Sequence, residues 1–245
     1  MNAIKAVVLA AGKGTRLHSE ENPLPKVLRT ACGRPLLEWV LEALDFIPRQ
    51  DAVIVVGYKK EKVMEAFPDC AFAVQEPQMG TGHAVQCAAG ALENFDGTVL
   101  VCYGDMPLVR RESYQALLAE HWRSGAACTV MSAWSENPMG FGRVLRDADG
   151  NFLRIVEQRD CTPEELQVRE LNCGICAFDC KKLLGALSRL QPNNAQSEYY
   201  LTDVPAILRA DGELVRVQKL EHSEEILGVN TPEQLADAEN WLRQR

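Results

Sequence analysis

The sequence predicts an α/β fold with a mostly parallel mixed sheet, helices on both faces and a small antiparallel β extension. Two observations lead to this prediction. Short runs rich in Val and Ile alternate with segments of helical periodicity in the first half, and after residue 125 extended segments joined by turns take over. The 245 residues, 47% of them hydrophobic, are enough to bury one sizeable core.

The first strands are apolar runs without polar alternation, as expected for parallel strands buried on both faces. They cover residues 4–10, 51–57, 70–75 and 98–105. The segments between them repeat apolar residues at helical spacing and predict helices over 35–46, 59–67, 81–95 and 111–122. A repeated strand, helix, strand order is typical of a parallel sheet with its helices packed on both sides.

The second half predicts strands that pair differently. Extended segments occupy 126–134, 141–147 and 151–158, followed by a strand over 171–179, a helix over 181–190 and a late strand over 213–220. The chain closes with an amphipathic helix over 231–245, for which Thr231 is a suitable N-cap and Pro232 a suitable first residue. The polar stretch 191–198 is a candidate functional loop.

Composition excludes several classes of protein. The formal charge of −8, from 34 acidic and 26 basic side chains without a basic tail, argues against binding to nucleic-acid backbones. The N-terminal apolar run is too short for a signal peptide or a membrane span, so we expect a cytoplasmic protein without a membrane partner. An odd number of cysteines, nine, without a secretion signal indicates reduced thiols.

Three of these cysteines, Cys173, Cys176 and Cys180, form a CxxC followed by a CxxxC. A strand places the first two on opposite faces, and no second pair or histidine lies at zinc spacing. We therefore expect no metal site there.

The stretch LAAGKGTRL, residues 9–17, follows the first strand. It is not a Walker A loop, because the first glycine of that motif would fall on Val7. It is a poor dinucleotide fingerprint, because the third glycine would fall on Leu17. The glycines of this loop therefore belong to neither of these two nucleotide-binding motifs.

The loop has the properties of a site for a triphosphate. Ala10 and Ala11 allow a ligand to approach closely, the glycines expose backbone N–H groups, and Arg16 and Lys26 add positive charge. The alternative for this segment taken by itself is a glycine-rich turn at a strand end with solvated basic side chains.

Further motifs occur along nearly the whole chain. They are PLPKVL (23–28), QEPQMGTGHAV (75–85), YGDMPL (103–108), FGRV (141–144), IVEQRD (155–160), NAQSEYYLTD (194–203) and GVNTPEQL (228–235). In this order they resemble the sugar nucleotidyltransferases, or nucleoside-diphosphate-sugar pyrophosphorylases, and most closely the N-terminal uridylyltransferase domain of the bifunctional GlmU proteins. The resemblance implies a Rossmann-like nucleotidyltransferase fold and Mg²⁺-dependent transfer of UMP from UTP to N-acetylglucosamine 1-phosphate, or a close sugar 1-phosphate.

The implied reaction needs no general base. A phosphate oxygen of the sugar 1-phosphate attacks the α-phosphorus of UTP and pyrophosphate leaves, so alignment and charge neutralisation suffice. The resemblance implies that Arg16 and Lys26 are catalytic. Asp105 follows a strand at the carboxyl edge of the sheet and would bind Mg²⁺, and the resemblance implies that Asn230 is the second protein ligand. The structural alternatives are a turn-capping role for Asp105 and an Asx turn at Asn230.

The resemblance also implies two groups of substrate-binding residues. The nucleotide would contact Leu9, Ala10, Ala11, Gly12, Gly14, Gln75, Gln78, Gly80 and Thr81, and the sugar Tyr103, Gly104, Gly142, Glu157 and Asn172. The alternatives are a polar loop capped by Thr81, an exposed Glu157 paired with Arg159, and an ordinary strand-end Asn172.

The sequence departs from the family pattern at three places. HSEENPL (18–24) lengthens the gap between Arg16 and Lys26, Cys173 stands where the family has threonine, and Ser197 replaces a glycine. The sugar identity is therefore open. The chain stops after LRQR without hexapeptide repeats, so we expect one nucleotidyltransferase domain over 1–245, no left-handed β-helix and no β-helix trimer.

Two other functions remain open. One is nucleotidyl transfer to another sugar or alcohol phosphate, and the other is a regulator that binds UDP-sugar without turning it over.

Overall fold

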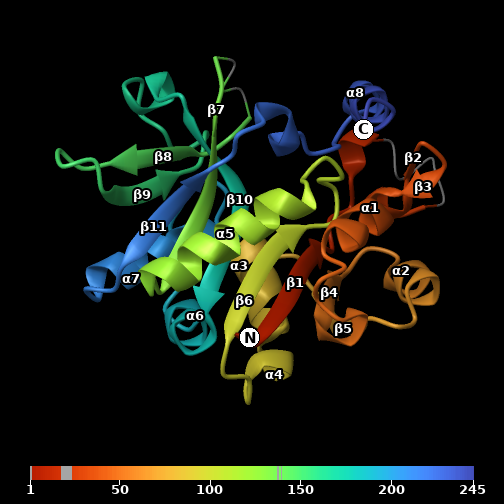
Figure 1. The fold of residues 1–245 in the computed structure, drawn as a ribbon, viewed down its shortest axis with the longest axis horizontal. Helices are drawn as coiled ribbons and strands as arrows, with labels where there is room; N and C mark the ends of the chain where they lie inside the picture. The colour runs from red at the N-terminus through yellow and green to blue at the C-terminus, as the bar shows by residue number, and fades with distance from the viewer. Residues whose placement is uncertain (1, 18–23, 137, 139) are drawn as a thin grey trace.

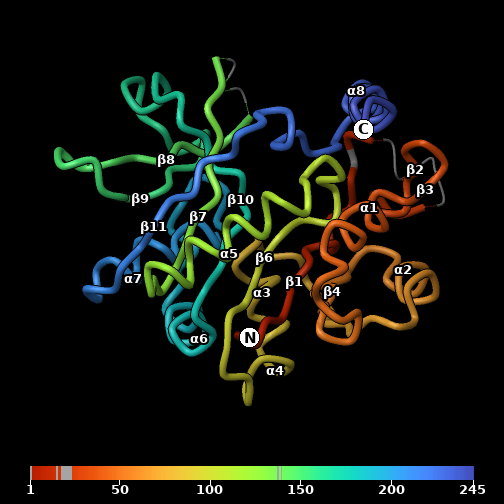
Figure 2. The backbone as a smooth tube through the Cα atoms, in the orientation of Figure 1, coloured from red at the N-terminus to blue at the C-terminus, as the bar shows by residue number. Residues whose placement is uncertain are grey.

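The computed structural model describes residues 2–17, 24–136, 138 and 140–245. Within them a nine-stranded sheet has the order β11-β7-β10-β6-β1-β4-β5, with the β8–β9 hairpin attached to β10 (Figures 1 and 2). The strands are β1 (Ile4–Ala10), β4 (Ala52–Val56), β5 (Ala71–Val74), β6 (Thr98–Tyr103), β7 (Cys128–Trp134), β8 (Arg143–Arg146), β9 (Phe152–Val156), β10 (Glu170–Asp179) and β11 (Val215–Lys219).

The sheet is mixed in the predicted way. β6, β1, β4 and β5 are mutually parallel, β10 runs antiparallel to both β6 and β7, and β11 is parallel to β7. The helices are α1 (Leu36–Ala43), α2 (Lys60–Ala66), α3 (Thr81–Cys87), α4 (Ala89–Leu92), α5 (Arg111–Ser124), α6 (Cys180–Leu187), α7 (Val204–Ala210) and α8 (Pro232–Leu242).

Both faces of the sheet are covered, because alternate residues of the buried strands feed two separate core clusters. In β1, Ala6 and Val8 pack with α1, α2 and α5, whereas Val7 and Leu9 pack with α3, α6 and α7. This two-residue alternation is the direct consequence of the pleat. The predicted α/β architecture is confirmed.

Most element boundaries fall within a few residues of those expected. The helix predicted over 81–95 divides at Ala88 into α3 and α4, and the C-terminal helix begins as expected, with Thr231 Oγ1 accepting from Gln234 N at 3.3 Å. No helix in the described part of the chain has the length and apolar character needed to span a bilayer.

Two elements had no clear sequence signal. One is α7, which has only seven residues with a proline in its first turn. The other is a hairpin of two-residue strands, β2 (Thr30–Ala31) and β3 (Arg34–Pro35), turned by Cys32 and Gly33 at φ 51° and 78°. Both are too short to show periodicity.

The CxxC cysteines lie in different core layers. Cys173 belongs to the cluster under α1 and α5, Cys176 and Cys180 to the cluster under α3 and α6, and all nine cysteines are free thiols. The expectation that the strand separates Cys173 from Cys176 is confirmed.

The topology places a crevice at the carboxyl ends of β1 and β6. The chain leaves β1 toward β4 and β5 on one side, then crosses to β6 on the other, so β1 pairs with both neighbours in parallel. Connections that diverge from adjacent strands leave an opening between them, which is where open α/β sheets bind ligands.

Candidate functional site

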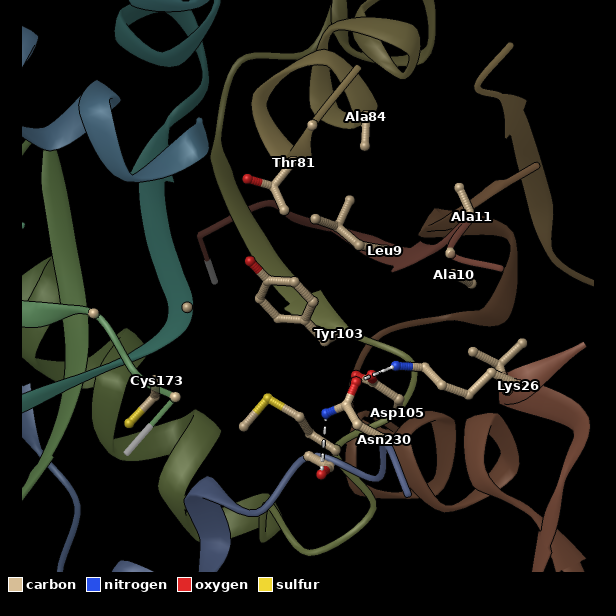
Figure 3. A pocket seen from close by; sticks show the side chains of 18 of the residues that line it. Leu9, Ala10, Ala11, Lys26, Thr81, Ala84, Tyr103, Asp105, Cys173 and Asn230 are labelled. Carbon is tan, nitrogen blue, oxygen red and sulfur yellow. Dashed lines mark hydrogen bonds and ion pairs between the residues drawn. The ribbon is translucent and has the colours of Figure 1, made fainter. Parts of the chain in front are cut away.

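A pocket of about 560 Å³ lies in this crevice (Figure 3). It collects all but two of the residues expected at the site from the sequence. They are Leu9, Ala10, Ala11, Gly12, Arg16, Lys26, Gln75, Gln78, Gly80, Thr81, Tyr103, Asp105, Gly142, Glu157, Asn172 and Asn230.

The two exceptions are glycines that shape the pocket rather than line it. Gly104 N donates to Leu9 O at 2.9 Å, and a Cβ there would lie 3.1 Å from Leu37 and 3.2 Å from Val27. Gly14 has a φ of 64°, and its carbonyl accepts from Leu17 N at 2.9 Å. Close packing explains the first glycine and the left-handed backbone explains the second.

A cluster of opposite charges occupies one end of the pocket. Lys26 Nζ donates to Asn230 Oδ1 at 3.0 Å and forms an ion pair with Asp105, and Arg16 reaches the same Asn230 oxygen at 3.3 Å. Figure 3 shows the lysine ammonium directed at Asp105 beside Asn230. Residues 18–23 of the lengthened segment lie outside the described residues, but its two basic ends converge.

Backbone contacts hold Asn230 beside Asp105. Val229 N donates to Asp105 O at 2.9 Å, and Val229 is fully buried against α8. The Asn230 amide nitrogen donates to Gly228 O at 3.3 Å, which turns its oxygen toward the cations. The alternative of an Asx turn at Asn230 is wrong, because its Oδ1 accepts from Lys26 and Arg16 and the residue two positions on, Pro232, has no N–H to donate.

This cluster has the donor chemistry of a magnesium site. One carboxylate and one amide oxygen converge on a single cation, which here is the Lys26 ammonium. Among the described residues, no group of three or more His, Cys, Asp or Glu side chains could hold a metal by itself. A divalent ion bound by Asp105 and Asn230 would therefore need phosphate oxygens and water as its other ligands, which is the coordination that Mg²⁺ favours.

The loop before α3 forms a second side of the pocket. Gln78 Nε2 donates to Ala11 O at 2.9 Å, tying this loop to the glycine-rich loop. Gly82 N donates to Tyr199 O at 2.7 Å, and Tyr199 N donates to Met79 O at 2.8 Å, so the loop also joins the segment 194–203. Thr81 does not cap α3, because its Oγ1 accepts from Leu201 N at 3.1 Å.

A bulge in β10 forms the opposite side. The pairing of β10 with β7 shifts register between Asn172 and Cys176, and Gly174 in the bulge has a φ of 74°. Asn172 Oδ1 accepts from Gly174 N at 3.0 Å, and a Cβ on Gly174 would lie 2.5 Å from the Tyr103 ring. The bulge thus presses the backbone against Tyr103, as bulges near functional sites often do.

Glu157 is largely buried on this side. It accepts a hydrogen bond from Thr202 Oγ1 at 3.0 Å, and burial raises the pKa of its carboxyl group. Arg159 is exposed and makes no ion pair with it among the described residues, so the alternative of an exposed Glu157–Arg159 pair is wrong. A buried carboxylate with one neutral partner retains capacity to accept further hydrogen bonds.

Sequence reasoning missed several lining residues. Lys13 stands inside the glycine-rich loop, and Phe141 and Gln234 stand inside the motifs FGRV and GVNTPEQL, so a signal was present although no role was assigned to them. Glu198 also lines the pocket, so the loop predicted over 191–198 reaches the site. Ser197, in the place of a family glycine, has a φ of 54°, the conformation for which glycine is suited.

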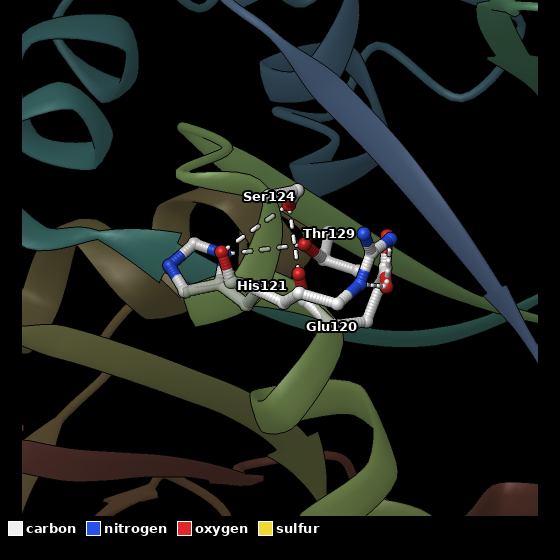
Figure 4. A network of polar contacts seen from close by, with 5 residues as sticks. Glu120, His121, Ser124 and Thr129 are labelled. Carbon is white, nitrogen blue, oxygen red and sulfur yellow. Dashed lines mark hydrogen bonds and ion pairs between the residues drawn. The ribbon is translucent and has the colours of Figure 1, made fainter.

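A histidine and a serine meet elsewhere, but in a structural role (Figure 4). His121 Nδ1 lies 3.2 Å from Thr129 Oγ1, and Ser124 Oγ donates to Glu120 O at 2.7 Å. Burial lowers the pKa of His121, and none of these residues lines the pocket. The serine hydroxyl is committed to the last turn of α5 and is not an activated nucleophile.

The chain was compared with known proteins. The family described as "MobA-like NTP transferase domain" matches residues 6–193. The bifunctional protein GlmU of Pelobacter propionicus is 48% identical over 248 aligned positions, covering 100% of this chain and 53% of that protein. The bifunctional protein GlmU of Geobacillus thermodenitrificans is 42% identical, covering 98% of this chain and 52% of its own length.

The chain thus spans about half the length of these curated relatives. Among solved structures, a putative glucose-1-phosphate thymidylyltransferase from Bacillus anthracis, in complex with a sucrose, superposes with a TM-score of 0.76. It is 20% identical, and the match covers 99% of this chain and 96% of that one, which supports the fold. The family match, the fold and the arrangement of the pocket agree, and the chain belongs to the MobA-like NTP transferase family of nucleotidyltransferases.

Proposed function

We propose that this protein transfers UMP from UTP to N-acetylglucosamine 1-phosphate, or a close sugar 1-phosphate, giving the UDP-sugar and pyrophosphate. The observation that supports this most directly is the convergence of Arg16, Lys26, Asp105 and Asn230 at one end of a two-sided pocket. The likeness to GlmU proteins over the whole chain favours this reaction over other nucleotidyl transfers.

The proposed chemistry uses charge and alignment. The sugar phosphate is already deprotonated at neutral pH, so its oxygen can attack the α-phosphorus without a base. Arg16 and Lys26 counter the charge that accumulates on the phosphates. Lys13 and the backbone N–H groups of the glycine-rich loop add to the positive electrostatic potential there. Mg²⁺ held by Asp105 and Asn230 would neutralise phosphate charge.

The two sides of the pocket take different parts of the substrates in this proposal. The base lies against the loop carrying Gln75 and Gly80, and the sugar against Glu157 and the β10 bulge at Asn172. Glu157 keeps acceptor capacity for sugar hydroxyls because Thr202 supplies only one hydrogen bond.

The proposal is tested by pyrophosphate release from purified protein with Mg²⁺, UTP and one sugar 1-phosphate at a time. N-acetylglucosamine 1-phosphate, N-acetylgalactosamine 1-phosphate and glucose 1-phosphate are compared, and we expect strong preference for one. If none of the three releases pyrophosphate but another alcohol phosphate does, the result would support the alternative acceptor. Tight UDP-sugar binding without exchange of labelled pyrophosphate into UTP would support the regulator.

Replacing Lys26 should separate metal binding from activity. Its ammonium occupies the oxygens of Asp105 and Asn230, so Lys26→Met is expected to raise the affinity for Mn²⁺ in the absence of nucleotide severalfold, while pyrophosphate release falls by about 10²-fold or more. Calorimetry with Mn²⁺ measures the first effect. Lys60→Met, which removes a surface pair with Glu76, is the matched control, and equal or weaker Mn²⁺ binding by Lys26→Met would refute the competition.

Glu157→Gln should stabilise the folded protein and weaken its binding of the sugar phosphate. Since burial raises the pKa of this carboxyl group, the folded state loses stability as pH rises through that raised value. The glutamine variant avoids this loss, so at neutral pH we expect it to gain about 1 kcal/mol, or roughly 2–4 °C in Tm, while its KM for the sugar phosphate rises at least about tenfold.

The pH dependence identifies the cause of that gain. Thermal melts of both proteins should converge below the ordinary carboxyl pKa, where Glu157 is protonated in the folded and unfolded states alike. The exposed Glu93→Gln provides a control that should not change Tm at any pH. A Glu157→Gln variant that melts lower than the wild type at neutral pH would contradict the argument.

A further inference from the structure

Gln75 has a buried side-chain amide, and both hydrogens of its NH₂ group face hydrogen-bond acceptors. The side chain is 4% exposed, and its Nε2 lies 2.9 Å from Gly80 O and 3.2 Å from His83 Nδ1. His83 stands one turn into α3, so its ring approaches the amide from the helix while the Gly80 carbonyl approaches from the preceding loop.

These contacts determine the orientation of the amide. A carbonyl oxygen only accepts hydrogen bonds, so the Gln75 atom beside Gly80 O has to be the NH₂ group. The same group then donates its other hydrogen to His83 Nδ1, which has to be unprotonated. The proton of the neutral ring is therefore on Nε2, which lies 3.8 Å from Cys87 Sγ.

The remaining amide atom is Gln75 Oε1. This oxygen accepts no hydrogen bond from any residue that the structure describes. It is also not one of the completely buried, unpartnered polar atoms, so part of it remains accessible. Because Gln75 lines the pocket, this oxygen is available to a ligand as an acceptor only.

We propose that His83 is a positioning residue that sets the choice of nucleobase. By holding the Gln75 NH₂, it leaves Oε1 to receive an N–H group, which uracil and thymine carry at N3 and cytosine does not. The inference rests on the proposed function in that it places the base beside Gln75.

The opposite orientation would be unfavourable at two contacts. Rotating the amide would bring Oε1 against the Gly80 carbonyl and would require the proton of His83 to move from Nε2 to Nδ1. Removing the histidine acceptor eliminates one of these two restraints. The amide could then turn toward cytosine at a lower cost, and selectivity should fall by about one hydrogen bond, or roughly five- to tenfold.

The test compares direct binding of UTP and CTP by calorimetry in the wild type and two variants. His83→Phe keeps a ring of similar size without an acceptor and should reduce the preference for UTP five- to tenfold. His83→Asn can place its amide oxygen near the position of Nδ1 and should keep most of the preference. The exposed His222→Phe is the matched control and should not change it.

The outcomes separate the two proposals. A wild type that prefers UTP but turns over no phosphate acceptor removes the proposed function and keeps the positioning role. An active enzyme whose UTP preference survives His83→Phe overturns the positioning role alone. Should His83→Phe not fold, ¹⁵N spectra of the wild-type histidines decide instead: a neutral ring protonated on Nδ1 overturns the proposal, and one protonated on Nε2 supports it.

Discussion

Asp105→Asn is expected to lower the rate of pyrophosphate release by about 10³-fold, because it removes the only carboxylate of the proposed metal site. The amide has nearly the same shape and can still accept a hydrogen bond from Lys26. It carries no charge, however, and so contributes far less to holding a divalent ion among phosphates. The variant should therefore fold normally and fail mainly in kcat.

Three measurements test this prediction. Steady-state kinetics with saturating Mg²⁺ should show a large drop in kcat, Mn²⁺ calorimetry should show weakened binding, and thermal melts should stay close to the wild type. Asp96→Asn removes the same charge from an exposed pair with Lys181 and should change neither activity nor stability. Near-normal kcat in Asp105→Asn would remove this residue from the site and leave Asn230 without a metal-binding partner.

The fold could be predicted because its signals are local. Strands buried on both faces contain long runs of apolar residues, as in DAVIVVG, and the α5 segment repeats apolar residues at helical spacing. The missed elements are those where local patterns are too short, namely α7 and the β2–β3 hairpin. Their positions depend on packing and turn geometry.

The site was predictable to the level of which residues gather, but not how they contact one another. The family resemblance implied that Asp105 and Asn230 share one site, yet the hydrogen bond from Val229 N to the Asp105 carbonyl joins segments more than a hundred positions apart. The hydrogen bond between Thr202 and Glu157 likewise joins two separate segments of the chain, 45 positions apart. Such contacts depend on the completed topology and leave no local pattern in the sequence.

The orientation of the Gln75 side-chain amide is another feature of the site that could not be predicted from the sequence. From sequence, a glutamine offers both a donor and an acceptor to a base. In the folded protein, Gly80 O and His83 Nδ1 take both donors, so a ligand meets an acceptor alone. The sequence identifies the residue type, and the surrounding structure determines which of its capacities remains available for recognition.

Gly80→Ala is expected to cost about 2–4 kcal/mol of stability and to weaken UTP binding at least about tenfold. Gly80 has a φ of 104°, where side chains are strained, and an added Cβ would lie 2.6 Å from Tyr199 O. This neighbour is backbone that itself accepts from Gly82 N, so it cannot move without breaking the link to the segment 194–203. The clash could therefore be relieved only by a shift of the loop that carries Gly80, and this shift would distort the nucleotide side of the pocket.

Gly90→Ala is the matched control, because it makes the same chemical change in α4, where nothing lies within 4 Å of the new Cβ. Alanine suits a helix better than glycine, so this variant should gain up to about 1 kcal/mol and keep its UTP affinity. Thermal melts and UTP calorimetry on both variants measure the contrast. If Gly80→Ala melted and bound UTP like the wild type, the loop would be able to adjust, and the close approach of Gly80 to Tyr199 would not be what shapes the nucleotide side of the pocket.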